Sequence, residues 1–303
     1  MKQVSAFAPA TIANFNVGYD VLGVSLNNIG DEVKLIINDT KVNKIIEIKN
    51  GETLPKAIEK NCCSVVIYEM QKAQNSFVGV DIIIVKGFAS GSGLGSSSAS
   101  SAAAAYAYNA LIGKPYSTKE LVHFAALGEK VACGTAHIDN VSPSLLGGII
   151  LATGTNIDKI IELPVIDNLY AVTLFPNIKI NTSDSRKILK DNVSLDVYRQ
   201  QIGFMGSFVS SLYENNLKRF SESLKDLLIE PMRSLLIPKF NEMRVAAEEV
   251  GALTFGISGS GPSVFAICEG EQRASNILKA LEETYKDTGI SIEKYCNKIS
   301  ENS

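Results

Sequence analysis

The sequence predicts an α+β protein made of two mixed layers of strands and helices. Strand patterns fill most of the first third of the chain, a helix rich in alanine follows them, and a second series of strands and helices begins near residue 170. Hydrophobic residues make up 46% of the 303 residues, which is typical of a folded chain long enough to bury a large core. We expect two domains, at residues 1–160 and 161–303.

Short apolar runs rich in β-branched residues mark the strands of the first domain. They cover residues 4–7, 32–37, 44–48 and 80–85. Residues 97–112 carry alanine and other small residues at nearly every position, which favours a helix that packs closely on a sheet. Ser117 and Glu120 then form a capping-box pattern, so we expect the next helix to start there and to run to about Val131.

The second domain begins with a strand pattern at residues 170–174. Patterns of helical period follow at residues 195–228 and 239–250. Two apolar runs, at residues 253–257 and 264–268, flank a glycine-rich turn and predict a strand pair. A final helix and strand complete the second layer.

Charge and composition exclude several classes of protein. With 29 basic and 32 acidic residues, the net charge of -3 provides no overall field for nucleic acid or anionic lipid, so we expect a small-molecule partner. The chain lacks the apolar run of a secretion signal and any run of about 18 apolar residues. Its five cysteines lack the paired spacing of zinc motifs and fit a reducing compartment. We therefore expect a cytoplasmic protein with no nucleic-acid or membrane partner.

A loop with the sequence Gly-Ser-Gly-Leu-Gly-Ser-Ser-Ser, at residues 91–98, separates the fourth strand from the alanine-rich helix. Free N–H groups and the positive end of the helix dipole converge at a helix N-terminus, and glycine lets phosphate oxygens approach the backbone. Ser96 replaces the third glycine of a dinucleotide fingerprint, and the P-loop lysine is absent. We interpret the loop as a phosphate cradle for ATP; the alternative is a helix cap of closely packing residues.

Two further turns supply candidate site residues. The segment Gly-Ile-Ser-Gly-Ser-Gly-Pro, at residues 256–262, would by itself be a hairpin turn, because glycine and serine favour turns without any ligand. Combined with the first loop, it becomes a candidate wall of an active site. Near the N-terminus, the residues from Asn14 to Asp20 interrupt a strand pattern and supply one amide and one carboxylate.

His137, Asp139 and Asn140 gather polar side chains just before the apolar strand that ends the first domain, and such clusters often face a cleft. His137 is either a general base or a structural histidine. Asn140 cannot act as a base but can position a hydroxyl group by hydrogen bonding. Arg186, in the first turns of an expected helix, and Arg233, at a helix break, could together clamp a carboxylate; as surface arginines they would have no such role.

Four segments make the chain resemble the GHMP family of small-molecule kinases and, within it, the homoserine kinases. They are Ala-Pro-Ala-Thr-Ile-Ala-Asn at residues 8–14 with Gly-Tyr-Asp-Val-Leu-Gly at 18–23, the glycine loop at 91–97, His-Ile-Asp-Asn-Val-Ser-Pro at 137–143, and Ser-Gly-Ser-Gly-Pro at 258–262. The two glycine segments are typical of the whole family. The histidine segment and the stretch at residues 14–20 are typical of homoserine kinases.

The resemblance implies an N-terminal domain like domain 2 of ribosomal protein S5, a ferredoxin-like C-terminal domain, and an active site between them. It implies Mg²⁺-dependent transfer of the ATP γ-phosphate to the side-chain hydroxyl of L-homoserine in threonine biosynthesis, and it implies a homodimer. By position, the ATP-binding residues would be Asn61, near the adenine, and Ala89, Ser90, Gly91, Ser92, Gly93, Leu94, Gly95, Ser96, Ser97, Ser98 and Ala99. Magnesium would bind Ser97 and Glu129, and the substrate would contact Asn14, Asp20, His137, Asn140, Arg186 and Arg233. The catalytic residues would be Asn140, Ser97 and Glu129.

The chain departs from the family pattern at Ala89, where proline is frequent, and at Asn16, where glycine is frequent. It shows no clear match to the aspartate base of several GHMP kinases, which fits catalysis by positioning and charge stabilisation. Three alternatives stay open at this point. They are an NAD-dependent oxidoreductase, a catalytically silent nucleotide-binding regulator, and a kinase for another alcohol such as mevalonate or a sugar.

Overall fold

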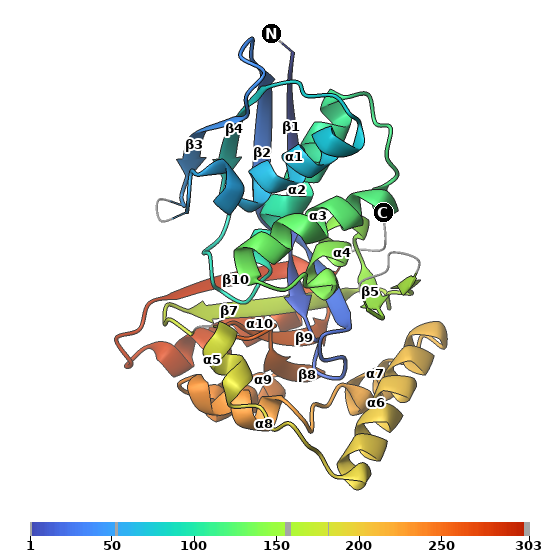
Figure 1. Ribbon diagram of the computed structural model, residues 1–303. Coiled ribbons are helices and arrows are strands. Elements are labelled where there is room, and N and C mark those ends of the chain that lie inside the picture. The colour runs from blue at the N-terminus through green and yellow to red at the C-terminus, as the bar shows by residue number, and fades with distance from the viewer. Residues whose placement is uncertain (1, 52–53, 155–158, 181, 300–303) are drawn as a thin grey trace.

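The computed structural model describes residues 2–51, 54–154, 159–180 and 182–299. Its described strands form two sheets (Figure 1). The first has the order β3 (Lys44–Lys49), β4 (Val80–Val85), β2 (Leu22–Ile37), β5 (Ile149–Ala152), β6 (Ile160–Leu163), with β1 (Gln3–Ala13) paired to β2. The second has the order β10 (Ile292–Lys298), β7 (Leu169–Pro176), β9 (Val264–Glu269), β8 (Thr254–Ile257). The predicted α+β class is confirmed.

Strand β2 connects the two parts of the first sheet. Its C-terminal half pairs with β4 and with the start of β1, whereas its first residues pair with β5 and with the end of β1. The β1–β2 register shifts between Pro9 and Thr11, where proline has no N–H group to donate to a ladder. Beyond this shift, Leu26 forms a bridge with Ile299, so the two sheets meet at this point.

Helices α2 (Ser96–Leu111) and α4 (Ile138–Leu146) pack against the first sheet, and α1 (Cys62–Ala73) and α3 (Thr118–Cys133) pack on α2 (Figure 1). Helix α2 lies against β1 and β2 and also contacts the other three helices. Its alanines from Ala102 to Ala105 are fully buried, because only small side chains fit where a helix is surrounded this closely. The capping box predicted at Ser117 is present, and α3 ends at Gly134 in a left-handed conformation.

The second sheet carries α9 (Phe240–Glu249) and α10 (Glu271–Tyr285), while α6 (Leu195–Tyr213) and α7 (Leu217–Ser223) pack on each other. Two short helices, α5 (Thr182–Lys187) and α8 (Glu230–Arg233), belong to the same half of the molecule as the second sheet (Figure 1). None of the described helices combines the length and the hydropathy of a membrane span.

An aromatic cluster belongs to a core that both sheets share. The ring of Phe15, in the turn after β1, stacks on Phe265 of β9 with centroids 5.5 Å apart and also contacts Phe208 and Phe220. Asn14, Phe15 and Asn16 have positive φ angles of 69°, 43° and 58°, a region that a bulky residue such as phenylalanine rarely adopts. Burial of the Phe15 ring therefore holds an unfavourable turn in place.

Three local predictions were wrong or incomplete. The helix expected at residues 195–228 is two helices, because Asn215 adopts a positive φ and Asn216 accepts a bond from the N–H group of Arg219 as the cap of α7. The apolar strand expected after the His137 segment is present as β5, but helix α4, which begins at Ile138 and contains Pro143, was not predicted. Helix α1 was not predicted. The first sheet ends at Leu163 and the second begins at Leu169, and the division after residue 160 stays a prediction.

Candidate active site

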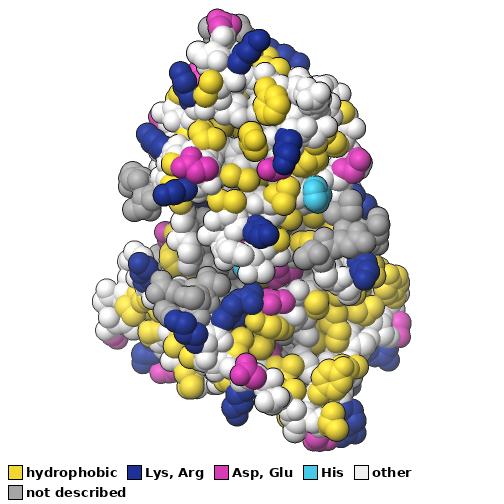
Figure 2. Space-filling view, in the orientation of Figure 1, with side chains coloured by type: hydrophobic (Ala, Val, Ile, Leu, Met, Phe, Trp, Pro, Cys, Tyr) yellow, Lys and Arg dark blue, Asp and Glu magenta, His cyan; other side chains and the backbone are white. Residues whose placement is uncertain are grey.

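A cavity of about 410 Å³ lies between the glycine loop, the end of α3, the start of α4 and the second glycine turn. On the face of the molecule shown in Figure 2, basic and acidic side chains are interspersed, in keeping with the small net charge. The cavity is lined by both polar and apolar residues. Its lining combines residues from both halves of the chain, as the sequence predicted.

The glycine loop forms one wall. Gly91, Gly93 and Gly95 all have positive φ angles, and Gly95 is the N-cap of α2. A Cβ atom at Gly93 would lie 2.8 Å from the carbonyl oxygens of Ser258 and Gly261, so glycine is required for the close approach of the second turn. At Gly91 a Cβ atom would meet nothing within 4 Å. The loop thus exposes backbone to the cavity at the start of a buried helix.

The two glycine segments are joined by hydrogen bonds. The Ser258 hydroxyl donates to the carbonyl oxygen of Gly93 at 2.7 Å, and the N–H group of Ser263 donates to the carbonyl oxygen of Ser92 at 3.0 Å. Gly259 and Ser260 line the cavity opposite the loop. The 258–262 segment is therefore a hairpin turn and also a wall of the cavity, which are the two interpretations that the sequence left open.

A buried charged network lies beneath the loop and was not predicted. Lys86 follows β4, is 3% exposed, and binds the carboxylate of Asp31. Its Nζ atom also donates to the Ser96 carbonyl oxygen at 3.0 Å and to the Ser100 hydroxyl at 2.8 Å. A charged group this buried is stable only when it is paired. The network ties the N-terminus of α2 to strands β2 and β4. In the sequence, the feature that could have indicated it is Lys86, a charged residue directly after an apolar run.

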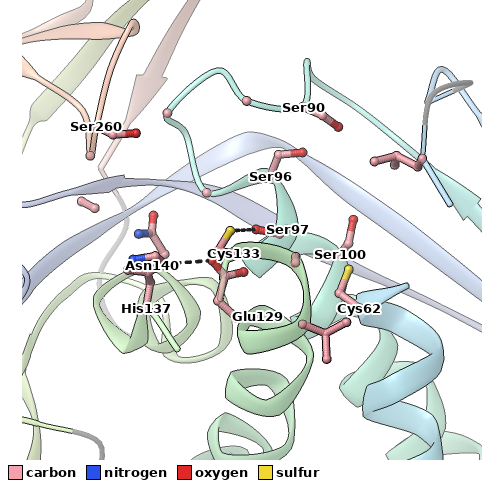
Figure 3. A pocket seen from close by; sticks show the side chains of 18 of the residues that line it. Cys62, Ser90, Ser96, Ser97, Ser100, Glu129, Cys133, His137, Asn140 and Ser260 are labelled. Carbon is pink, nitrogen blue, oxygen red and sulfur yellow. Dashed lines mark hydrogen bonds and ion pairs between the residues drawn. The ribbon is translucent and has the colours of Figure 1, made fainter. Parts of the chain in front are cut away.

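The end of α3 brings Glu129 and Cys133 to the cavity, and His137 follows at the start of α4 (Figure 3). Glu129 is 3% exposed, and its Oε1 atom lies 3.3 Å from Nδ1 of His137. Its Oε2 atom is buried without a hydrogen-bond partner among the described residues. The Ser97 hydroxyl lies 3.4 Å from Sγ of Cys133. A buried carboxylate oxygen without a partner, in a residue that lines a cavity, is accounted for by a bound ligand or ion.

Hydrogen bonds with Cys133 and with Glu129 raise the pKa of His137 to about 10, against the opposing effect of burial. The contact with Arg186 favours the neutral form of the same ring. The Nη2 atom of Arg186 lies 3.1 Å from Nε2 of His137, and because a guanidinium group only donates, this contact requires Nε2 to accept. The neighbours on its two sides therefore favour opposite protonation states of the ring.

Asp139 and Asn140 extend from the first turn of α4 into the cavity. Burial raises the pKa of Asp139 to about 7, although His137 opposes this shift. The Oδ1 atom of Asn140 accepts a hydrogen bond of 2.7 Å from the Thr11 hydroxyl, which fixes the orientation of the amide. Asp139 was named in the sequence as part of a polar cluster, but it was not assigned to the site.

Three further charged side chains, Asp20, Arg186 and Arg233, line the cavity. Arg186 Nη2 lies 3.3 Å from Oδ2 of Asp20, and both side chains are about 40% exposed. Arg233 is 3% exposed and donates to the carbonyl oxygen of Gly259 at 2.9 Å. Its guanidinium carbon lies 5.3 Å from the centre of the Tyr19 ring, a cation–π distance. Arg186 lies in the last turn of the short helix α5, not in the first turns of a longer helix.

The turn after β1 positions the remaining polar groups. The Oδ1 atom of Asn14 accepts a hydrogen bond from the N–H group of Asp20 at 3.0 Å, and its Nδ2 atom donates to the carbonyl oxygen of Gly259 at 3.0 Å. Asn16, where the family often has glycine, is buried and donates to the Thr254 hydroxyl at 2.9 Å. It belongs to the structural support of the turn rather than to the cavity wall.

Most of the residues that the sequence proposed are brought together. The cavity is lined by Asn14, Asp20, Asn61, Ser90, Gly91, Gly93, Gly95, Ser96, Ser97, Glu129, His137, Asn140, Arg186 and Arg233. Five proposed residues do not line it, namely Ala89, Ser92, Leu94, Ser98 and Ala99. The last four are buried, because alternate residues of the loop and the inner face of α2 turn toward the core. Sequence reasoning missed Lys86, Cys133 and Asp139 as lining residues.

The family models of two domains match the chain: the GHMP kinases N terminal domain at residues 60–148 and the GHMP kinases C terminal domain at residues 208–287. A homoserine kinase of Chlorobium phaeobacteroides is 37% identical over 94% of this chain and 92% of that protein. A homoserine kinase of Chlorobaculum tepidum is 37% identical over 97% and 94%. The crystal structure of homoserine kinase from Cytophaga hutchinsonii is 39% identical, covers 100% of this chain and 96% of its own, and superposes with a TM-score of 0.95. The chain belongs to the GHMP kinase family.

Proposed function

We propose that the chain is a homoserine kinase, which transfers the γ-phosphate of ATP to the side-chain hydroxyl of L-homoserine and forms O-phospho-L-homoserine for threonine biosynthesis. The observation that carries this proposal is a set of three charged side chains that line the cavity, namely Asp20, its ion-pair partner Arg186, and Arg233. An amino acid presents one ammonium and one carboxylate group, which this set complements. The similarity to homoserine kinases over nearly the whole chain supports the same assignment.

ATP would bind along the glycine loop. The exposed backbone at Gly91 and the N–H groups at the start of α2 suit the phosphates, because a helix N-terminus stabilises negative charge. The aromatic base would reach the part of the cavity lined by Leu54, Pro55 and Asn61, which offers apolar surface and one amide. The buried Lys86 network would support the loop from below and not contact the phosphates itself.

Magnesium would be held by Glu129 and Ser97. The fit rests on the Oε2 atom of Glu129, which is buried without a hydrogen-bond partner among the described residues, and on the preference of Mg²⁺ for oxygen ligands. When bound, Mg²⁺ would neutralise charge on the transferring phosphate.

Catalysis would rest on position rather than on a dedicated base. Phosphoryl transfer passes through a loose transition state, so alignment of the hydroxyl group and stabilisation of charge can supply most of the rate enhancement. Asn140, fixed by Thr11, would hold the substrate hydroxyl in line, while His137 and Asn14 complete the substrate wall. The loop amides would stabilise the charge on the phosphate oxygens.

The cellular setting and the assembly remain part of the proposal. The described cysteines are all free, which supports a reducing compartment such as the cytoplasm. Association into a homodimer rests on the family resemblance alone, and the molecular mass in solution measured by light scattering would test it.

The decisive test of substrate class is coupled ADP release over a panel of alcohols. Homoserine, mevalonate, shikimate and galactose would each be supplied with ATP and Mg²⁺. We expect turnover with homoserine and background rates with the other three. Preferred turnover of mevalonate or galactose would assign a different kinase of the same family, and ADP release with none of them would favour a silent nucleotide-binding protein.

A further inference from the structure

Glu129, Cys133 and His137 form a compact cluster of possible metal ligands at the edge of the cavity (Figure 3). Glu129 and Cys133 are four residues apart on α3 and so share one face of the helix. Gly134 then ends α3 with a φ angle of 78°, which turns the chain back and brings His137 beside them. One ligand atom from each residue lies within 4.8 Å of those from the other two.

The chemistry of this cluster differs from that of a magnesium site. Magnesium takes oxygen ligands, whereas a thiolate, an imidazole and a carboxylate together are the ligand types of zinc. The Oε2 atom of Glu129 is buried and has no hydrogen-bond partner among the described residues, so a donor atom is available without breaking a bond. Cys133 is exposed, and its thiol is therefore accessible to an ion from solvent.

We propose that Glu129, Cys133 and His137 form a binding site for Zn²⁺ or another thiophilic divalent ion. Three protein ligands leave a fourth position for water, as in open zinc sites. Ligand atoms of a tetrahedral zinc lie roughly 3.3 to 3.8 Å apart, given Zn–ligand distances of about 2.0 to 2.3 Å. The pair formed by Glu129 Oε1 and His137 Nδ1 is already 3.3 Å apart. The third ligand atom, Sγ of Cys133, lies within 4.8 Å of the other two.

Binding releases protons to solvent, because zinc takes a thiolate from Cys133 and a free nitrogen lone pair from His137. Zinc would also occupy groups that the proposed function needs. It would engage the carboxylate assigned to Mg²⁺ and the imidazole assigned to the substrate wall. Inhibition of phosphoryl transfer by zinc follows, and this consequence rests on the proposed function, whereas the binding site itself does not.

Cobalt titration of the full chain, without nucleotide or substrate, tests the site directly. We expect one Co²⁺ per chain to give a near-ultraviolet thiolate-to-cobalt charge-transfer band that Zn²⁺ abolishes by displacement. Cys133→Ser should remove the band and weaken Zn²⁺ binding, measured by calorimetry, by about 10-fold or more, since even outer-shell changes cost that much. Cys296→Ser, which alters another exposed cysteine on β10, is the matched control and should retain both signals.

Two results would overturn the proposal. One is a titration of the unaltered chain that gives no charge-transfer band; the other is a band that persists in Cys133→Ser or disappears in Cys296→Ser. Zinc inhibition of ADP release is the second readout, with each variant compared with its own zinc-free rate, and half-inhibition of Cys133→Ser should need about 10-fold more zinc or higher. A cobalt band without kinase activity would contradict the proposed function and leave the site standing, whereas kinase activity without a band would do the reverse.

Discussion

The Nη2 atom of Arg186 lies 3.1 Å from the Nε2 atom of His137. The same nitrogen lies 3.3 Å from Oδ2 of Asp20, so one guanidinium group links two elements of the proposed substrate wall. The pair with Asp20 is about 40% exposed on each side, and ion pairs this exposed contribute little to stability. In the proposed function, an amino-acid substrate would replace it, with its ammonium group on Asp20 and its carboxylate on the arginines.

Arg233→Ala should raise the KM for homoserine by about 30-fold or more, which corresponds to roughly 2 kcal/mol for a lost buried charge partner, and should change the KM for ATP far less. Steady-state kinetics measures both constants. The analogue 3-aminopropan-1-ol lacks the carboxylate, so the variant and the unaltered chain should phosphorylate it at similar rates. A matching loss on this analogue would show a general structural defect, and Arg199→Ala, on the exposed surface of α6, is the control.

Ser97→Ala should lower magnesium-dependent turnover by about 10²-fold, the scale of one lost catalytic contact. Ser98→Ala is the matched control, because the neighbouring hydroxyl is buried, has no hydrogen-bond partner among the described residues and does not line the cavity. The measurement is the rate of ADP release across a Mg²⁺ titration. Equal rates for Ser97→Ala and the unaltered chain would remove Ser97 from the proposed ligands.

Asp139→Asn should lower kcat by less than about 10-fold, because Asn140 and charge stabilisation carry the proposed reaction. General bases contribute about 10² to 10⁴-fold. A loss on that scale, with the KM for homoserine unchanged, would identify Asp139 as a base and contradict the mechanism. The comparison of kcat between the two proteins at saturating substrates decides between these outcomes.

The same residue should make stability depend on pH. The pKa of Asp139 is raised from 3.8 to about 7, so the folded state binds more protons than the unfolded state between these values. Its contribution to stability is then present at low pH and is lost as the pH rises through this window. Asp139→Asn should therefore gain Tm relative to the unaltered chain as the pH goes from 5 to 8. Asp191→Asn, at an exposed position, should show no such trend.

Lys86→Met should destabilise the fold by about 3 to 5 kcal/mol, because it leaves the buried carboxylate of Asp31 without its charged partner. The double variant Lys86→Met with Asp31→Asn should recover part of the loss. Urea unfolding measures both. If the double variant is less stable than Lys86→Met alone, the cost lies in packing rather than in an unpaired charge.

Much of the fold was predictable because the signals are local. The capping box at Ser117, the alanine-rich α2 and the turn between β8 and β9 each depend on neighbouring residues. Helix α4 was missed because its start looks like a polar strand entrance and Pro143 argues against a helix, yet packing against the sheet and α2 overrides the local preference. The long helix at residues 195–228 was wrong because two asparagines outweigh its apolar period.

The site was predictable in a different way. Turns, a polar cluster and helix breaks made Asn14, Asp20, His137 and the two arginines candidates, and the family resemblance assigned them to one substrate site. Their convergence depends on contacts between distant parts of the chain that no local pattern encodes. Lys86 and Cys133 escaped notice because their roles come from what folding places next to them. Lys86 contacts the carboxylate of Asp31, which is 55 residues away in the sequence, and Cys133 lies close to His137, the N-cap of α4.

Identification of the product tests the central claim most directly. ³¹P nuclear magnetic resonance of a mixture of the chain, ATP, Mg²⁺ and L-homoserine should show ADP and a new phosphate monoester in equal amounts, and mass spectrometry should place the phosphate on the side-chain oxygen of homoserine. Formation of ADP with free phosphate alone, or of a phosphate ester only when another alcohol replaces homoserine, would contradict the assignment.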